Sequence, residues 1–203
     1  WAPKGSQERD VYVWSDDPNK YASAPVLFKK FESSNWEWDE VAGQYYLHRF
    51  LSHQPDLNYE NPWVQEQMLD VVDFWLERGV DGFRLDAVPF LFESEGTRCE
   101  GLPETHEFLC KVRKRVDNSG RDVLLLAEAI QPVIEAAPYL ADDELHGAFN
   151  FALTAHLFAA IASGLSKNLR LCLEESQQAV PGTHWALPLR NHDELWLGDG
   201  HLV

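Results

Sequence analysis

The sequence predicts an α/β fold with a parallel sheet, and three observations predict it. From residue 61 onward, segments with apolar residues at helical spacing alternate with short apolar runs. The run at 123–127, Val-Leu-Leu-Leu-Ala, is continuously apolar, which is typical of a parallel strand buried on both faces. No glycine-rich phosphate loop follows an expected strand, which disfavours a nucleotide-binding doubly wound sheet. We therefore expect a segment of a (β/α)8 barrel, whose chemistry lies where strands end and βα-loops begin.

Residues 1–60 do not share this regular alternation and are expected to form a separate, irregular subdomain ahead of the barrel segment 61–203. Their turn-forming stretches lie at 16–19, 33–35 and 39–43, with short strand-like pieces at 12–14 and 44–50.

The barrel segment is expected to begin with a helix that Asn61 caps, that has Pro62 at its first position and that Gly79 ends. A strand follows at 80–88, and a second helix runs from Pro103 to about residue 118. The remaining expected elements, in order, are a strand at 123–127, a helix at 132–139, a strand at 145–151, helices at 152–164 and 167–178, and a strand at 184–189.

The overall composition limits the classes of partner. With 33 acidic against 17 basic residues the net charge is −16, which disfavours nucleic acid and anionic membranes as partners. The three cysteines lack metal-ligand spacing and predict a reducing, cytoplasmic location without a disulfide framework. No apolar run is long enough to span a membrane, and no signal peptide is recognised. Because the chain starts at Trp1 and stops after a polar turn, we expect a fragment of a longer protein.

Carboxylates end three separate expected strands. Asp86 lies two residues after Arg84, so both face the same side of a strand, and the cation keeps the carboxylate ionised. Glu128 directly follows the apolar run, where desolvation suits it to general acid work. Asp193 follows His192 in a polar cluster after the last strand. Retaining glycoside hydrolysis needs a nucleophile and an acid/base about 5 Å apart, and a third carboxylate can stabilise developing positive charge.

Each of these residues alone has an ordinary structural interpretation. Arg84 and Asp86 suit a structural ion pair inside a barrel, Glu128 suits a cap or a salt bridge, and His192 suits a loop surface. A different (β/α)8 enzyme could also use Arg84, Asp86 and Glu128 for metal-assisted chemistry, although the sequence shows no clear ligand set.

Four motifs in order resemble those of the α-amylase family, glycoside hydrolase family 13. They are Gly-Phe-Arg-Leu-Asp-Ala at 82–87, Ala-Glu-Ala at 127–129, Arg-Asn-His-Asp at 190–193, and Gln-Pro-Asp-Leu-Asn at 54–58 in the version of the oligo-1,6-glucosidase-like branch. The resemblance implies Asp86 as nucleophile, Glu128 as acid/base and Asp193 as transition-state stabiliser, with Arg84 and His192 contacting substrate. It also implies barrel strands 4 to 7, with residues 1–60 in the subdomain inserted after strand 3.

Within the family the chain resembles the trehalose synthase (maltose α-D-glucosyltransferase) subgroup. The stretches that carry this likeness are 53–62, 87–92, 95–97, 102–106 and 191–195. Small α-glucosides such as maltose or trehalose are the implied partners, with no organic cofactor and calcium possible in the full-length protein. Two departures, Ala-Ile-Gln-Pro at 129–132 for Ala-Asn-Gln-Trp and Asn150 for the usual His, keep an α-glucosidase or α-amylase open.

The family's first motif, an Asp followed by Asn-His after the third strand, is absent, as are strands 1 to 3 and 8. A truncated, inactive carbohydrate-binding fragment is therefore a second alternative. We expect these 203 residues alone to be weakly stable and inactive, because half a barrel exposes two long sheet edges. The oligomeric state is left open.

Overall fold

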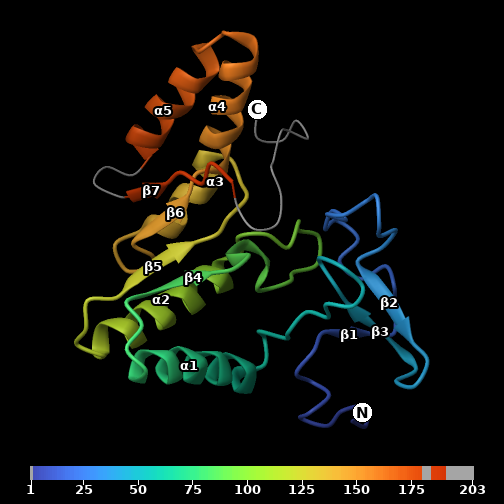
Figure 1. Ribbon diagram of the computed structural model, residues 1–203. Coiled ribbons are helices and arrows are strands. Elements are labelled where there is room, and N and C mark those ends of the chain that lie inside the picture. The colour runs from blue at the N-terminus through green and yellow to red at the C-terminus, as the bar shows by residue number, and fades with distance from the viewer. Residues whose placement is uncertain (1, 180–183, 191–203) are drawn as a thin grey trace. The chain divides into compact units, whose positions relative to one another are not determined.

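A computed structural model describes residues 2–179 and 184–190, and the chain divides into two compact units (Figure 1). One unit contains the residues up to Val72 together with Pro89–Phe108. The other contains Asp73–Val88 and the residues from Leu109 onward. The expected division into 1–60 and 61–203 stays a prediction, because the units are defined by packing and not by the order of barrel strands.

The first unit is built on a three-stranded antiparallel sheet of order β1-β3-β2. Its strands are β1 (Trp14–Ser15), β2 (Trp36–Asp39) and β3 (Gln44–Leu47). The sequence did not predict β2, although its alternating Trp-Glu-Trp-Asp pattern has the period of a strand with one buried face. Buried apolar side chains gather against this sheet: Val13, Tyr21, Ala24, Trp36, Leu47 and Cys99.

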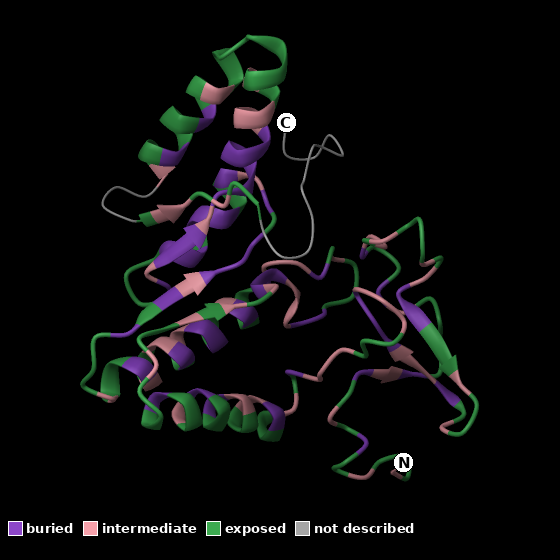
Figure 2. Ribbon diagram, in the orientation of Figure 1, coloured by how far each residue is buried: buried purple, intermediate pink, exposed green. Residues whose placement is uncertain are grey.

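The second unit is built on a four-stranded parallel sheet, which confirms the predicted α/β class. The strands, in spatial order, are β4 (Gly82–Leu85), β5 (Leu124–Ala127), β6 (Gly147–Phe149) and β7 (His184–Ala186). Strands β5 and β6 are largely buried whereas β4 is not (Figure 2). In this strand order β4 and β7 are the outer strands of the sheet formed by the described residues. On one side of each, no neighbouring strand of this described sheet pairs with the backbone N–H and C=O groups.

Helices connect these strands, as the alternating pattern requires. Their bounds are α1 (Pro62–Glu77), α2 (Pro103–Asn118), α3 (Val133–Ala136), α4 (Phe151–Ser163) and α5 (Lys167–Ala179), with 3-10 turns η1 (Val88–Phe90) and η2 (Ala137–Leu140). The Asn61 side chain caps α1 by accepting the N–H of Trp63 at 2.9 Å. The single helix expected at 132–139 is wrong, because Pro138 lacks the N–H that would continue it and a 3-10 turn follows α3 instead.

The observed strands are shorter than the sequence suggested. The strand expected at 80–88 ends at Leu85, where Ala87 takes a positive φ of 48° and turns the chain out of the sheet. Gly147 allows β6 and β7 to approach closely, since a Cβ there would lie 2.8 Å from the His184 carbonyl oxygen. None of the helices described for this chain has both the length and the apolar character that crossing a membrane requires.

Candidate active site

Two neighbouring parallel strands bring Asp86 and Glu128 to the same edge of the sheet. Leu85 of β4 pairs with Ala127 of β5, so the next residue of each strand is one of these acids. The Glu128 N–H donates to the Leu85 carbonyl at 2.9 Å, and the Val88 N–H donates to the Glu128 carbonyl at 3.2 Å. The carboxyl ends of parallel barrel strands carry the reactive groups in this architecture, and the backbone fixes both positions.

Arg84 joins the two acids through one guanidinium nitrogen. Its Nη2 lies 2.8 Å from Asp86 Oδ1 and 2.6 Å from Glu128 Oε2. Because both oxygens contact the same nitrogen, their separation cannot exceed the sum of these two distances. That limit lies within the spacing of about 5–5.5 Å between the two carboxyl groups of retaining glycosidases. An inverting enzyme needs a wider gap for water, so the geometry favours retention.

The two carboxyl groups lie in different surroundings. The Glu128 side chain is 9% exposed and the Asp86 side chain 70% exposed. Burial raises the pKa of Glu128, the Arg84 hydrogen bond lowers it, and the hydrogen bond and negative charge of Asp86 raise it again, with a net rise above the ordinary value. A raised pKa keeps Glu128 protonated closer to neutral pH, which is what a general acid requires.

Backbone strain lies directly beside Asp86. Ala87 has a φ of 48°, a left-handed conformation that residues with a Cβ rarely adopt. Such a conformation costs about 1–3 kcal/mol and persists only where the surrounding structure enforces it. Because the chain turns at Ala87, the strand predicted at 80–88 does not continue past Leu85. The side chain of Asp86 is exposed to solvent.

The third acid of the predicted set, Asp193, lies outside the described residues together with His192, and the roles of both stay predictions. At the end of the next strand, β6, Asn150 serves a structural purpose. Its side chain accepts the Leu153 N–H at 2.8 Å and donates to Ser176 Oγ at 2.7 Å. The structure thus brings together Arg84, Asp86 and Glu128, while Asn150 is committed to capping α4.

A family model described as the catalytic domain of alpha amylase matches residues 2–197. The chain belongs to the alpha-amylase catalytic-domain family. Its four-stranded parallel sheet is accordingly part of a (β/α)8 barrel, as predicted.

Several relatives are similar to this chain over most of its length. The trehalose synthase/amylase TreS of Mycolicibacterium smegmatis is 49% identical over 193 residues, covering 93% of this chain and 32% of that protein. Among solved structures, the alpha-glucosyl transfer enzyme XgtA has a TM-score of 0.79 at 28% identity, over 94% of this chain and 40% of that one. Isomaltulose synthase from Erwinia rhapontici NX5 has a TM-score of 0.78 at 27% identity, over 95% and 38%. The chain thus spans only part of the length of these relatives.

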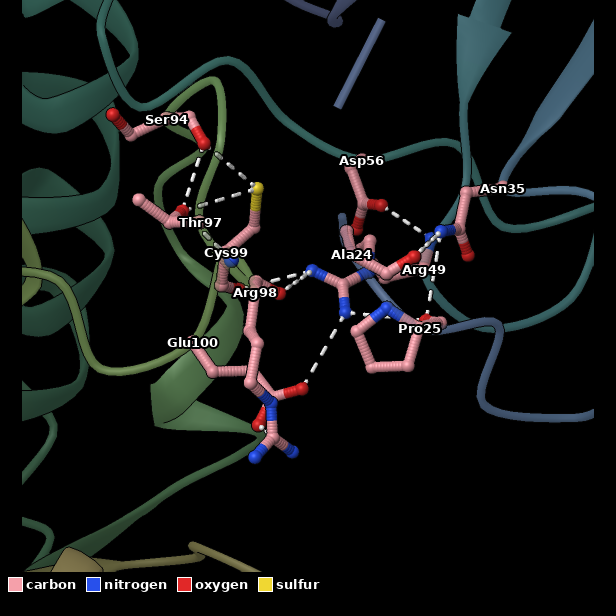
Figure 3. A network of polar contacts seen from close by, with 10 residues as sticks. All are labelled: Ala24, Pro25, Asn35, Arg49, Asp56, Ser94, Thr97, Arg98, Cys99 and Glu100. Atoms are coloured by element: carbon pink, nitrogen blue, oxygen red, sulfur yellow. Dashed lines mark hydrogen bonds and ion pairs between the residues drawn. The ribbon is translucent and has the colours of Figure 1, made fainter. Parts of the chain in front are cut away.

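Calcium was expected as a possible ion in the full-length protein. The acid of the 54–58 motif, Asp56, is half-buried, and its Oδ2 accepts the backbone N–H of Arg49 at 2.6 Å. Across residues 2–179 and 184–190, no three His, Cys, Asp or Glu side chains form a group that could hold a metal ion. Calcium in the full-length protein therefore stays a prediction, and the Asp56 contact links the motif to the backbone of Arg49 within the first unit (Figure 3).

Two acids of the first unit with raised pKa values, buried Glu93 and half-buried Asp56, escaped the sequence reasoning. Burial, together with the negative charge of Asp56, raises the pKa of Glu93 to about 8, and the charge of Arg49 opposes this rise. Burial raises the pKa of Asp56 to about 6, against the hydrogen bond and charge of Arg49. Nothing in the local sequence marks Glu93 as buried, since it lies in a loop rich in polar residues.

Glu93→Gln is expected to flatten the dependence of stability on pH. The folded pKa of about 8 exceeds the ordinary 4.5, so protonated Glu93 stabilises the fold fully below about pH 4.5 and loses this effect as pH rises through 8. Between pH 5 and 8.5, the free energy of unfolding of the variant should therefore rise relative to that of the native protein by an amount on the order of a few kcal/mol. Thermal midpoints of the full-length protein across this range measure it. Exposed Glu40→Gln should run parallel to the native curve, and a parallel Glu93→Gln curve would contradict the assignment.

Proposed function

We propose that this chain carries the nucleophile and the acid/base of a retaining, trehalose-synthase-like enzyme that interconverts maltose and trehalose. The observation that carries the proposal is the contact of one Arg84 nitrogen with both Asp86 and Glu128. The likeness to the trehalose synthase/amylase of M. smegmatis supports the substrate class, which is small α-glucosides.

In the first half-reaction Glu128 gives its proton to the glycosidic oxygen while Asp86 attacks the anomeric carbon. The bond from this carbon to the leaving sugar breaks, and a covalent glucosyl ester of Asp86 forms with inverted configuration. Arg84 contacts the attacking carboxylate and holds it in place. Asp193 is proposed to stabilise the positive charge that develops at the sugar ring, and His192 to contact the substrate.

In the second half-reaction Glu128, now a carboxylate, takes a proton from the acceptor hydroxyl, whose oxygen attacks the anomeric carbon and releases Asp86. A second inversion restores the α configuration. If the acceptor is the retained glucose, bound through a different hydroxyl, the product is the isomeric disaccharide. If the acceptor is water, the product is glucose, so isomerisation depends on excluding water.

Hydrolysis by an α-glucosidase or α-amylase is the alternative function. The stretch after Glu128 departs from the trehalose synthase pattern with Ile130 and Pro132, and Ile130, two residues after the proposed acid, is 38% exposed. An apolar side chain there cannot offer the hydrogen bonds of an amide to a retained sugar. The relative's own name couples synthase with amylase, which fits a shared site serving both outcomes.

The remaining proposals concern partners and location. We infer neutral α-glucosides as substrates, no organic cofactor, no nucleic acid or membrane as partners of so acidic a chain, and a cytoplasmic location consistent with three free cysteines. Calcium in the full-length protein stays a prediction. We also expect these residues expressed alone to be inactive.

A product assay on the full-length protein tests the function. Maltose, trehalose and maltotetraose are offered separately, and products are separated by chromatography. Trehalose from maltose, and maltose from trehalose, are expected. Glucose as the sole product would favour the hydrolase, and no turnover of any of the three would overturn both.

A further inference from the structure

His146 holds the start of β6 against β5 with its side chain as well as its backbone. The two strands are parallel neighbours in the sheet (Figure 1), and β6 begins only at Gly147. The N–H of Leu125 donates to Nδ1 of His146 at 3.0 Å, and the N–H of His146 donates to the Leu125 carbonyl at 3.0 Å. The imidazole nitrogen thus takes the place of a strand carbonyl that β6, which has three residues, does not provide.

The bond to Nδ1 lies where the pairing of the two strands begins. Leu125 is 0% exposed, and the next residue, Leu126, is the first of β5 to pair with β6, opposite Gly147. A backbone N–H at such a position is costly to leave without an acceptor. A slip of one residue in strand pairing would turn every side chain to the other face of the sheet. His146 therefore fixes the register of β6 on β5 at its first pair.

The bond requires a neutral imidazole, because Nδ1 accepts only when it carries no proton. Burial, together with the positive charge of Arg113, lowers the pKa of His146, and the negative charges of Asp117 and Asp122 oppose this. The fold therefore favours the form of the ring that can accept the Leu125 N–H.

Arg113 is held where it acts on this ring. Its Nε donates to Asp117 Oδ1 at 2.9 Å within α2, and its Nη1 donates to the Glu144 carbonyl at 3.2 Å. The second bond ties α2 to the segment that leads into β6. A cation fixed two residues before His146 makes a second positive charge on the imidazole unfavourable.

The same strand β5 leads into the proposed acid/base. Two residues separate Leu125 from Glu128, whose N–H donates to the Leu85 carbonyl at 2.9 Å. This end of the strand is held to β4, while His146 holds the other end to β6. Arg84 of β4 contacts Glu128 Oε2 at 2.6 Å, so a shift of β5 against β4 would change this contact.

We propose that His146 is a positioning residue for Glu128: its unprotonated Nδ1 fixes β5 to β6, and protonation of the ring releases this bond. The inference rests on the proposed function, since it takes Glu128 as the acid/base. Misplacing a reacting group by about 1 Å can cost about 100-fold in rate, and a strand loosened at one end should cost less than that.

The test compares His146→Asn and His146→Leu with His184→Asn in the full-length protein. Asn and Leu have nearly the same shape, but only Asn has an atom in the place of Nδ1 that accepts a hydrogen bond, and it does so at any pH. His184 lies on β7 of the same sheet with an exposed side chain and is the matched control. A mechanism-based glucosyl fluoride inactivator that traps the ester counts competent sites, so that rates are expressed per competent site.

His146→Leu is expected to lower kcat per competent site roughly 3- to 30-fold at neutral pH, with little change in KM, and His146→Asn should restore most of this loss. Hydrogen exchange with mass spectrometry reports on the bond itself. The peptide that contains Leu125 should lose protection in His146→Leu at every pH. In the native protein it should lose protection only as the pH falls below about 6.5, the ordinary pKa of histidine, and in His146→Asn it should stay protected.

The pH profile keeps the inference testable if His146→Leu does not fold. The ratio of kcat in His146→Asn to kcat in the native enzyme should then rise as the pH falls below about 6.5, whereas the ratio for His184→Asn should stay constant. A purely structural His146 would change the number of competent sites and leave kcat per site and its pH profile as in the native enzyme, which overturns the inference. A native enzyme inactive on α-glucosides would instead refute the proposed function, and the exchange at Leu125 would still report on the bond.

Discussion

Asp86→Asn is expected to abolish turnover of maltose, with kcat falling roughly 10⁴- to 10⁶-fold, the range seen when a covalent nucleophile is removed. An amide is nearly the same size as the carboxylate but cannot form the glucosyl ester. It also removes one of the two acids that Arg84 contacts at 2.8 and 2.6 Å. The measurement is steady-state product formation from maltose and from trehalose, together with mass spectrometry for the trapped glucosyl-enzyme.

Asp81→Asn is the matched control for this experiment. Asp81 lies just before β4, and its side chain is 98% exposed with only a 3.8 Å contact to Arg121. It should keep native kcat and KM. An Asp86→Asn enzyme that still turns over maltose at a rate near the native one, with the ester detected elsewhere, would refute the nucleophile assignment.

Glu128→Gln is the second large expected loss, because the leaving sugar then has no proton donor. General acid catalysis contributes roughly 10²- to 10⁴-fold, so maltose turnover should fall by that amount. A glucosyl fluoride has a leaving group that needs little protonation. The rate at which Glu128→Gln forms the glucosyl ester from this substrate should therefore fall much less than its rate with maltose. The native enzyme should lose activity as pH rises through the raised pKa of Glu128, and the variant should lack this basic limb.

The comparison of the two substrates separates acid catalysis from general damage. Exposed Glu135 of α3 provides the control, since Glu135→Gln keeps the same chemical change at a surface position. Equal losses for maltose and glucosyl fluoride in Glu128→Gln would indicate a structural role for the residue. They would leave the enzyme without an identified general acid.

The sheet and part of the site could be predicted because their signals are local. The apolar run ending at Ala127 has the composition of a buried parallel strand, and the structure leaves Leu125 and Ala127 fully buried in β5. Once two such strands are parallel neighbours, the residues after them must meet at one edge. The contact of Arg84 with Glu128 follows from that register and needed no further information.

Other features depended on partners far away in the chain. Arg49 follows β3 in a segment that the sequence suggested as strand, and its principal acceptor, Cys99, lies in a loop without periodicity. Pro138 limited a helix that apolar spacing had favoured. Glu93 is 6% exposed although residues 94–96 directly after it are exposed, and no short window of sequence reveals this difference.

The cluster of Arg84, Asp86 and Glu128 also determines when each proton moves. The pKa of Glu128 is raised partly by the hydrogen bond and negative charge of Asp86. Once Asp86 is esterified in the proposed intermediate, its charge is gone while the Arg84 cation stays, so the proton affinity of Glu128 drops. A carboxyl group that released its proton to the departing sugar thereby becomes an acceptor for the incoming hydroxyl. In the proposed mechanism, the covalent state of Asp86 thus resets the proton affinity of Glu128 between half-reactions.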